Sequence, residues 1–421
     1  MTLLALTAAQ ALTPLETIAD AVVLIEDLII RAVGPRSEIA IPPGARTVDL
    51  GEKILAPGFV DVHIHGAAGR DVMEATPEAL EAVAAFVLRH GTTSFIPTTL
   101  SAPPEVLLPS LEGLGKTIRA WGKSRSGSHG TIAVPWAVAS GPASTTLLAE
   151  PLGIHLEGPF LSVDCRGVHP REHLQPPSLA LFDQMLAAAD GSVRILTLAP
   201  ELDGAAELQA AAIEKGVRVA IGHSNASYEQ AIRAVDAGAA HAVHVFNAMR
   251  PFAHRDPGIL GAILTDDRIL AEVIADGVHV AAPALRLLLR SKTPSRIALV
   301  TDGVSATGMP PGMHRLGGLE ILVAEVPSSE APGTGQFVCR NHEGKLAGSV
   351  LTQDRAVQNM IRLAGVTLRE AVLMASYVPA QMAGVAGRKG ALRPGADADL
   401  IVLHPDGTVA GAMVGGVGNF R

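Results

Sequence analysis

Residues 57–66, PGFVDVHIHG, form the stretch that decides the fold. A run of apolar and β-branched residues ends here in two histidines, a pattern typical of a buried strand with polar groups at its carboxyl end. Because side chains alternate along a strand, His63 and His65 lie on the same side of it, as paired metal ligands require. An isolated HxH is weak evidence, since a histidine on an apolar strand more often belongs to the core or the surface.

Seven further apolar runs follow along the chain, and amphipathic stretches such as 76–91, 207–216 and 228–238 separate several of them. Several of the amphipathic stretches end in Gly, where a helix C-cap is expected. Eight parallel strands joined by helices predict an α/β fold, a (β/α)8 TIM-like barrel. An open doubly wound sheet is the alternative, but no GxGxxG follows the first strand. The seven runs are TSFIPTT (93–99), LGIHLEGP (152–159), VRILTLAP (193–200), VRVAIGHS (217–224), HAVHVFNA (241–248), LAEVIADG (270–277) and IALVTDG (297–303).

Both ends of the chain consist of short strand-like segments and turns. We therefore expect residues 1–56 and 391–421 to build one small β-sandwich domain, and residues 57–390 to form the catalytic barrel. Two stretches do not fit the simple count of strands. Residues 124–150 are expected to be an extra strand-like and loop-rich piece, and residues 312–350 a β-hairpin excursion after the eighth strand.

The composition of the 421 residues is that of a globular protein with a large core, since 48% are hydrophobic, 18% are charged and the mean hydropathy is +0.32. The net charge of -8 and the absence of a basic run argue against nucleic acid as a partner. The sequence contains no stretch of 18 uninterrupted apolar residues, so no membrane-spanning helix is predicted. The two cysteines, Cys165 and Cys339, offer neither a disulfide framework nor a CxxC pair, so a reducing cytoplasm is expected.

Polar residues recur at the ends of the predicted strands. In a barrel these ends converge on one site, and imidazole and carboxylate groups are good ligands for a borderline divalent metal. Six such residues at the ends of five strands predict a metal centre far more strongly than the HxH alone. They are His63 and His65 after the first strand, Glu157 after the third, His223 after the fifth, His244 after the sixth and Asp302 after the eighth.

Longer motifs extend this pattern over nearly the whole chain. They are PGFVDVHIHG (57–66), HLEGPF (155–160), GHSNA (222–226), HVFNAM (244–249), DPGILGAIL (256–264), ADGVHV (275–280), LVTDG (299–303) and LAGSVLT (346–352). With these motifs the chain resembles the N-acetylglucosamine-6-phosphate deacetylase family of the amidohydrolase superfamily, which implies a barrel of the metal-dependent hydrolase type. The terminal GADADLIVL (395–403) is shared more broadly among amidohydrolases, so it supports the superfamily and not the substrate.

The resemblance implies a set of metal ligands. Glu157, His223 and His244 match the principal metal site, with Glu157 in place of the carboxylated lysine that bridges two metals in many other amidohydrolases. His63 and His65 are both retained, which favours a second ion, although members of the family differ in this respect. Zinc is the expected ion, with iron or manganese as alternatives, because ligand type does not determine the metal.

The resemblance also implies the catalytic roles. Asp302 would act as general base towards a metal-activated water and later pass the proton to the departing amine. His169, in the string CRGVHP, would polarise the acetyl carbonyl and stabilise the tetrahedral oxyanion. Without the matched motifs, we would interpret Asp302 as a strand-end turn or helix-capping carboxylate and His169 as a solvated loop histidine.

The substrate implied by the resemblance is a sugar phosphate, N-acetylglucosamine 6-phosphate. Arg255 and His279 match positions that contact the phosphate, and a neighbouring subunit would supply an arginine if the protein forms the expected homodimer. Asn247 and Ala248 match the segment that donates hydrogen bonds to the ligand. The run Leu346, Ala347, Gly348 and Ser349 is expected to line the acetyl and sugar side of the site.

Other functions use the same core residues. The metal and Asp302 would serve N-acetylgalactosamine 6-phosphate or N-acyl-amino-acid deacylation, deamination or cyclic-amide hydrolysis equally well. A non-catalytic scaffold with this fold is expected to have lost ligands or the catalytic acid, whereas all six residues are present here. The segments 124–150 and GVSATGMPPG (303–312) depart from the family pattern without removing a catalytic residue.

Overall fold

The computed structural model describes residues 3–127, 147–326 and 337–420. Its central element is a parallel barrel whose strands run in the order β6 (Phe59–Ile64), β9 (Thr92–Thr99), β11 (Ile154–Glu157), β12 (Val193–Leu198), β13 (Arg218–Ile221), β14 (His241–Ala242), β15 (Leu270–Ile274) and β16 (Ile297–Val300). Seven of them lie within the apolar runs identified in the sequence, and β9 begins one residue before its run. The predicted (β/α)8 barrel is therefore confirmed.

The first and last barrel strands meet at a short seam. Ile64 and Gly303 form a parallel bridge, and the backbone N–H of His65 donates to the carbonyl of Gly303 at 2.8 Å. The N–H of Asp302 likewise donates to the carbonyl of His63 at 2.9 Å. The barrel thus closes at the carboxyl ends of β6 and β16, where the predicted ligands lie.

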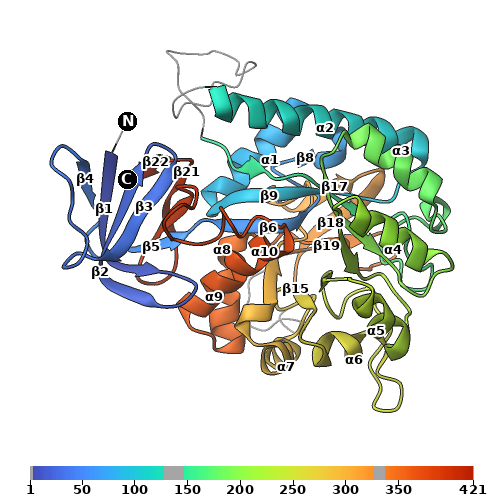
Figure 1. The fold of residues 1–421 in the computed structure, drawn as a ribbon. Helices are drawn as coiled ribbons and strands as arrows, with labels where there is room; N and C mark the ends of the chain where they lie inside the picture. The colour runs from blue at the N-terminus through green and yellow to red at the C-terminus, as the bar shows by residue number, and fades with distance from the viewer. Residues whose placement is uncertain (1–2, 128–146, 327–336, 421) are drawn as a thin grey trace.

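Helices surround the barrel (Figure 1). They are α1 (Pro77–Arg89), α2 (Pro104–Gly127), α3 (Leu179–Ala189), α4 (Ala205–Glu214), α5 (Tyr228–Asp236), α6 (Gly258–Thr265), α7 (Ala282–Lys292), α8 (Gln353–Asn359), α9 (Leu368–Ala375) and α10 (Tyr377–Met382). None of the helices in the described part of the chain combines the length and apolar character needed to cross a bilayer.

Helix α1 shows how the sequence specifies these elements. The Thr76 side chain accepts a hydrogen bond from the backbone N–H of Ala79, and Pro77 occupies the first helical position, so the helix begins there. Its apolar residues recur every three or four positions and are buried against the barrel, Leu80, Val83 and Val87 among them. Burial of each such side chain stabilises the fold by about 1.5–3 kcal/mol.

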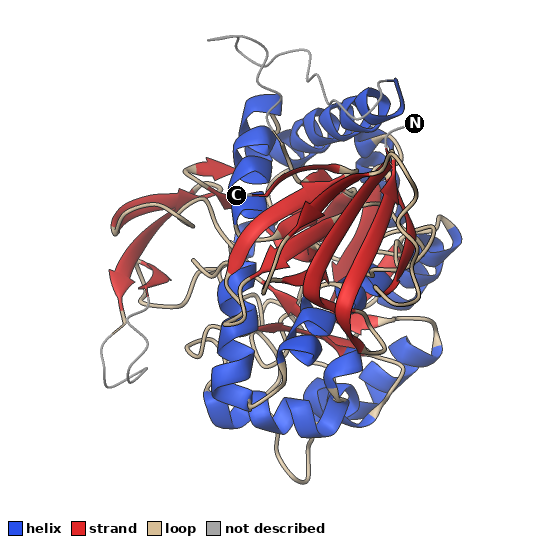
Figure 2. Ribbon diagram, turned by 90° about the vertical axis from the view of Figure 1, so that its left-hand side faces the viewer, coloured by secondary structure: helices blue, strands red, loops and turns tan. Residues whose placement is uncertain are grey.

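Strands from both ends of the chain form a separate sheet, as predicted. Its order is β22 (Val417–Phe420), β21 (Val409–Val414), β20 (Leu400–Leu403), β5 (Ile54–Pro57), β1 (Leu3–Leu12), β2 (Thr17–Glu26) and β3 (Ile29–Pro35), with β4 (Arg46–Asp49) also paired to β1. The N-terminal strand therefore lies in the same sheet as the C-terminal ones, and Figure 2 shows this sheet facing the viewer. A second hydrophobic core packs against it, with Leu6 and Val23 from one end and Leu400 and Met413 from the other.

Two sequence predictions about insertions need revision. The segment 312–350 holds three antiparallel strands, β17 (Gly312–Leu316), β18 (Leu319–Glu325) and β19 (Phe337–Asn341), and not a two-stranded hairpin. Its residues alternate in burial, so one face packs on the barrel mouth through Leu316, Ile321 and Val323. The first residues of the segment 124–150 continue helix α2, and its end forms the short strand β10 (Glu150–Pro151). Residues 128–146 lie outside the described part of the chain.

A buried ion-pair cluster joins the sheet to the barrel. Lys389 is only 2% exposed, and its Nζ lies 2.5 Å from a carboxylate oxygen of Glu150 in β10 and 2.9 Å from one of Asp397. It also contacts the buried carboxylate of Asp399, and Arg388 pairs with Glu150 and Asp397. Asp397 and Asp399 belong to the GADADLIVL motif, so in this chain that motif has a structural role.

We expect Lys389→Met to lower the free energy of unfolding by about 3–5 kcal/mol, because it leaves the buried carboxylate of Asp399 without its cation, whereas Arg388 still pairs with Glu150 and Asp397. Urea unfolding followed by circular dichroism measures the change. Lys215→Met is the matched control, since Lys215 forms an exposed pair with Asp183 at 3.3 Å and should cost at most about 1 kcal/mol. Equal effects of the two substitutions would contradict the structural role of Lys389.

Candidate metal centre and active site

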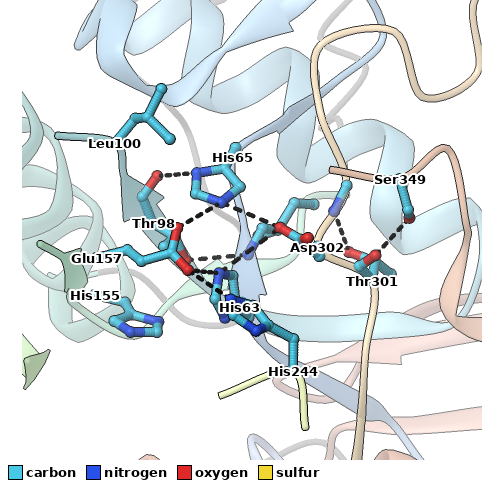
Figure 3. Close-up of polar contacts among 12 residues, drawn as sticks. His63, His65, Thr98, Leu100, His155, Glu157, His244, Thr301, Asp302 and Ser349 are labelled. Atoms are coloured by element: carbon cyan, nitrogen blue, oxygen red, sulfur yellow. Dashed lines mark hydrogen bonds and ion pairs between the residues drawn. The ribbon is translucent and has the colours of Figure 1, made fainter. Parts of the chain in front are cut away.

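The six predicted polar residues converge at the carboxyl ends of the barrel strands. His63 and His65 lie at the end of β6, Glu157 ends β11, and His223, His244 and Asp302 each lie two residues beyond β13, β14 and β16. All six are buried, with at most 9% of their surface exposed. Figure 3 shows His63, His65, His244 and Asp302 gathered around Glu157, although these five residues come from the ends of four strands, β6, β11, β14 and β16.

Three of these residues have a strained backbone. His223, His244 and Asp302 have φ values of 46°, 27° and 49°, in the left-handed region that side-chain-bearing residues rarely adopt. Such conformations cost on the order of 1–3 kcal/mol each and persist only where the surrounding structure imposes them. Two backbone hydrogen bonds hold Asp302 in this conformation. Its N–H donates to the carbonyl of His63, and its carbonyl accepts from the N–H of Ser349 at 2.8 Å.

The Glu157 carboxylate lies at the centre of the cluster. Its Oε1 is 3.1 Å from His223 Nε2, 2.9 Å from His244 Nε2 and 3.2 Å from His63 Nε2. Its Oε2 is 3.3 Å from both His65 Nε2 and His169 Nε2. Asp302 Oδ1 lies 3.2 Å from His65 Nε2 and 3.7 Å from His63 Nε2.

In three histidines, the hydrogen-bond partner of Nδ1 shows that the other ring nitrogen, Nε2, faces the cluster. The Nδ1 atoms of His65 and His223 lie 3.0 Å from the backbone carbonyls of Thr98 and Cys165, and Nδ1 of His63 lies 3.0 Å from Glu272 Oε2. These partners only accept hydrogen bonds, so each Nδ1 carries the hydrogen and each neutral ring turns its Nε2 lone pair inwards. Lone pairs that face a carboxylate repel it unless a cation or proton lies between them. The donor set therefore fits a divalent metal.

His169 has the opposite arrangement. The backbone N–H of Ser101 donates to its Nδ1 at 3.2 Å, so this nitrogen accepts, and the neutral ring carries its hydrogen on Nε2. The Ser101 hydroxyl lies 2.8 Å from the same Nδ1. His169 thus presents a hydrogen-bond donor to the site, which suits a residue that polarises a carbonyl and not one that binds a metal.

Burial and charge shift the pKa values within the cluster. Burial lowers the pKa of His65, but the hydrogen bonds to Asp302 and Glu157 outweigh it and raise the pKa to about 9. Burial raises the pKa of Asp302, but the hydrogen bond from His65 and the charge of His63 hold it below its usual value. Because its pKa is held low, Asp302 is ionised at neutral pH and can accept a proton. Burial lowers the pKa of His223 to about 4.

A pocket of about 150 Å³ opens onto this cluster. Asp302, His169 and Glu157 line it together with the predicted substrate residues Asn247, Ala248, His279, Leu346 and Gly348. The His279 ring is fixed by Asp276, whose Oδ2 lies 2.6 Å from His279 Nδ1. Burial lowers the pKa of His279, but the charge of Asp276 outweighs it and leaves the pKa raised, as suits a group that binds an anion.

Three predicted substrate residues do not line the pocket. Ala347 is fully buried in the small core beneath the three-stranded sheet. Ser349 is 2% exposed, and its hydroxyl donates to the Thr301 carbonyl at 2.5 Å, so it supports the backbone at Asp302. Arg255 lies on an exposed loop between β14 and α6 and is not among the residues that line the pocket.

Several residues of the site were missed by sequence reasoning. Leu100 and Leu316 line the pocket from the end of β9 and from the three-stranded sheet, and Ile274 lies at the end of β15. Asp61 and Glu272 lie beneath the cluster, both fully buried. The one available signal was a carboxylate within an apolar strand, in FVDVHI and LAEVI; the lining leucines gave none.

Comparison with known proteins defines the class of the protein. Residues 54–417 match the model of the amidohydrolase family. The chain is 38% identical to N-acetylglucosamine-6-phosphate deacetylase of Lysinibacillus sphaericus over 83% of this chain and 81% of the relative. It is 36% identical to N-acetylgalactosamine-6-phosphate deacetylase of Escherichia coli O157:H7 over 90% and 89% of the two chains.

Solved structures agree with the sequence relatives. N-acetyl-D-glucosamine-6-phosphate deacetylase of Mycobacterium smegmatis, in complex with N-acetyl-D-glucosamine-6-phosphate, superposes with a TM-score of 0.85 at 33% identity and covers 100% of both chains. The Pasteurella multocida enzyme gives a TM-score of 0.84 at 28% identity, again over 100% of both chains. The chain therefore belongs to the amidohydrolase family and, within it, to the N-acetylglucosamine-6-phosphate deacetylases.

We expect the apparent metal affinity to rise with pH until about pH 9. The pKa of His65 is raised to about 9 in the metal-free protein, so an ion that binds below this pH must displace a proton. Each displaced proton weakens the affinity up to about tenfold per pH unit below that value. Calorimetric titration at neutral pH, in two buffers of different ionisation enthalpy, counts the protons released. His65→Asn should release fewer protons, and a pH-independent affinity would contradict this prediction.

Proposed function

We propose that the protein removes the acetyl group from N-acetyl-D-glucosamine 6-phosphate, releasing D-glucosamine 6-phosphate and acetate. The observation that supports this most directly is the pocket itself. A metal-fitting carboxylate–histidine cluster, an ionised Asp302, a donor His169 and the Asp276–His279 pair all open into one space. The relatives and solved neighbours named above carry out, by name, the same reaction on this or the epimeric sugar phosphate.

The proposed metal ligands are Glu157, His223 and His244 for a principal ion and His63 with His65 for a second. Zinc is the proposed ion, since borderline imidazole and carboxylate donors suit it, with iron or manganese as alternatives. A divalent ion bound there supplies a Lewis acid and lowers the pKa of water from 15.7 to about 7.

The chain's own groups then perform the proton transfers and hold the acyl group. The Nε2–H of His169 faces the pocket and would donate to the acetyl carbonyl oxygen as negative charge develops on it. The Asp302 carboxylate would accept a proton from the attacking water and deliver it to the nitrogen of the departing amine. The strained backbone at Asp302 holds its carboxylate within hydrogen-bond reach of His65, at the edge of the pocket.

His279 and Arg255 are the proposed phosphate ligands. His279 lies in the pocket of its own chain, whereas Arg255 lies on an exposed loop. We therefore propose that Arg255 acts across the interface of a homodimer, where a guanidinium fork would match the phosphate oxygens. Asn247, Ala248 and the backbone at Leu346 and Gly348 would contact the sugar. A cytoplasmic location is proposed, in keeping with the unpaired cysteines.

N-acetyl-D-galactosamine 6-phosphate is the second candidate substrate. It differs in the orientation of one hydroxyl, and the relative from Escherichia coli O157:H7, which is named for that sugar, is 36% identical over 90% of this chain. The metal cluster and Asp302 would serve either sugar equally. Discrimination between the two therefore depends on groups that line the sugar side of the pocket.

The first test measures acetate released by zinc-loaded protein from three compounds: N-acetylglucosamine 6-phosphate, N-acetylgalactosamine 6-phosphate and unphosphorylated N-acetylglucosamine. We expect the highest kcat/KM for the first and the lowest for the unphosphorylated sugar. A preference for the galactosamine compound would select the second candidate. Release from none of them, with metal bound, would refute sugar phosphates as substrates and direct the search to acyl-amino acids and cyclic amides.

Asp302→Asn should reduce kcat by a factor of at least about 10² to 10⁴, because the amide cannot accept the proton. Substrate binding should persist, since the substituted group keeps its size and its place in the barrel. Single-turnover kinetics and a separate calorimetric titration with substrate distinguish the two effects. A rate close to that of the parent protein would exclude Asp302 as the general base.

Arg255→Ala should raise KM for the phosphorylated sugar by about tenfold or more, equivalent to a loss of at least about 1.4 kcal/mol of binding. The rate with unphosphorylated N-acetylglucosamine should not change, because that compound lacks the group that Arg255 binds. Arg290→Ala is a suitable control, since it removes the same charge from an exposed residue, in the last turn of helix α7, that does not line the pocket. An unchanged KM for the phosphorylated sugar would remove Arg255 from the phosphate site.

A further inference from the structure

A layer of buried polar side chains lies beneath the metal cluster, where a barrel is usually filled by branched apolar residues. It includes His155 on β11, His241 on β14 and Glu272 on β15, each with no exposed surface. The proposed reaction uses none of the three. His155 is accounted for locally, because its ring nitrogens lie 3.1 Å from the Val62 carbonyl and 2.7 Å from the Thr197 hydroxyl.

Glu272 has a different environment. Its Oε2 lies 3.0 Å from Nδ1 of His63. Its Oε1 has no hydrogen-bond partner among the described residues, and neither ring nitrogen of the neighbouring His241 has one. A buried carboxylate is costly unless a positive group compensates it. Burial keeps the pKa of the nearby His241 low, at about 4, so that ring is neutral, whereas His63 forms a hydrogen bond with Glu272 and connects it to the metal cluster.

The other predicted ligands are oriented differently. Backbone carbonyls hold His65 and His223, and Nδ1 of His244 has no partner within the described chain. His63 therefore differs from these three histidines in having a carboxylate behind it. A carboxylate that accepts from Nδ1 locks the ring orientation and makes the inward nitrogen a stronger ligand than a carbonyl would.

We propose that Glu272 is the positioning residue that holds His63 as a metal ligand and thereby allows the first-strand histidines to bind a second ion. In the described chain, no hydrogen bond or ion pair joins Glu272 to the side chains of the principal ligands Glu157, His223 and His244, so the first ion should bind without it. This inference rests on the metal centre of the proposed function and does not depend on the identity of the sugar.

The experiment measures metal content and affinity instead of activity. The full-length protein is stripped of metal with a chelator and titrated with Zn²⁺ by calorimetry, and the bound metal is counted by mass spectrometry after desalting. A parallel titration with Co²⁺ follows the d–d absorption of the bound ion. Glu272→Leu removes the acceptor, whereas Glu272→Gln keeps an acceptor oxygen but removes the charge.

We expect two ions per chain in the parent protein and one in Glu272→Leu. Glu272→Gln should keep two ions, with the second bound about 10–100-fold more weakly. Thr197→Val is the matched control, because it disturbs the same buried layer through His155, while the Thr197 hydroxyl forms no hydrogen bond with a proposed ligand in the described chain and Thr197 pairs with Glu157 through the strand backbone, which the substitution keeps. It should bind both ions as the parent does.

Several outcomes would overturn the proposal. They are a parent protein that binds a single ion, a Glu272→Leu variant that binds two ions with the parent's affinities, and a folded Glu272→Leu variant that loses both. If Glu272→Leu does not fold, an unchanged second affinity in Glu272→Gln overturns it equally. Should the metal results hold while no acetate is released from any sugar, the proposed substrate fails and the role of Glu272 stands.

Discussion

The seam between the first and last barrel strands is the constraint on which the site depends. His63 and Asp302 are more than two hundred residues apart in the chain, yet the backbone of one bonds to the backbone of the other. The buried Asp61 fastens the same seam by accepting hydrogen bonds from the Thr301 hydroxyl, at 2.6 Å, and from the Thr301 N–H. Burial raises the pKa of Asp61 to about 6. An ionisable group is thus retained inside the barrel where an apolar residue would pack at lower cost, because it holds two strand ends in register.

Once the seam is closed, the histidines differ in chemistry because their outer neighbours differ. The imidazole group is the same in His65, His223 and His169, but a carbonyl accepts from Nδ1 in the first two and an amide N–H donates to it in the third. Two rings therefore direct lone pairs at the centre, and one directs a hydrogen. The barrel assigns these roles through backbone groups of β9 and the loops after β9 and β11, without using a different residue type.

This division explains what could be predicted from the sequence. Polar residues at the ends of apolar runs are visible in the chain, so the sequence could predict all eight strands and the convergence of His63, His65, Glu157, His223, His244 and Asp302. The sequence does not show which backbone carbonyl a side chain contacts, so the partners that orient the histidine rings could not be predicted. Arg255 matched a motif, but a motif does not show that the residue lies on an exposed loop and does not line the pocket of its own chain. The hairpin expected at 312–350 became three strands because β19, which leads into the CRNHEGK turn, pairs with the earlier strand β18, and short-range pattern does not reveal this pairing.

The sheet built from both ends of the chain has a consequence for synthesis on the ribosome. Strand β5 pairs with β1 soon after both emerge, but its other neighbour, β20, is translated only after about 340 further residues, when the whole barrel has already been made. Until then, one edge of β5 and the apolar side chains that later meet Leu400 and Met413 lack their cover. Unpaired edges of this kind recruit other chains. The nascent protein therefore has a long interval in which its earliest strands need protection, and this interval ends when the last few dozen residues join the sheet.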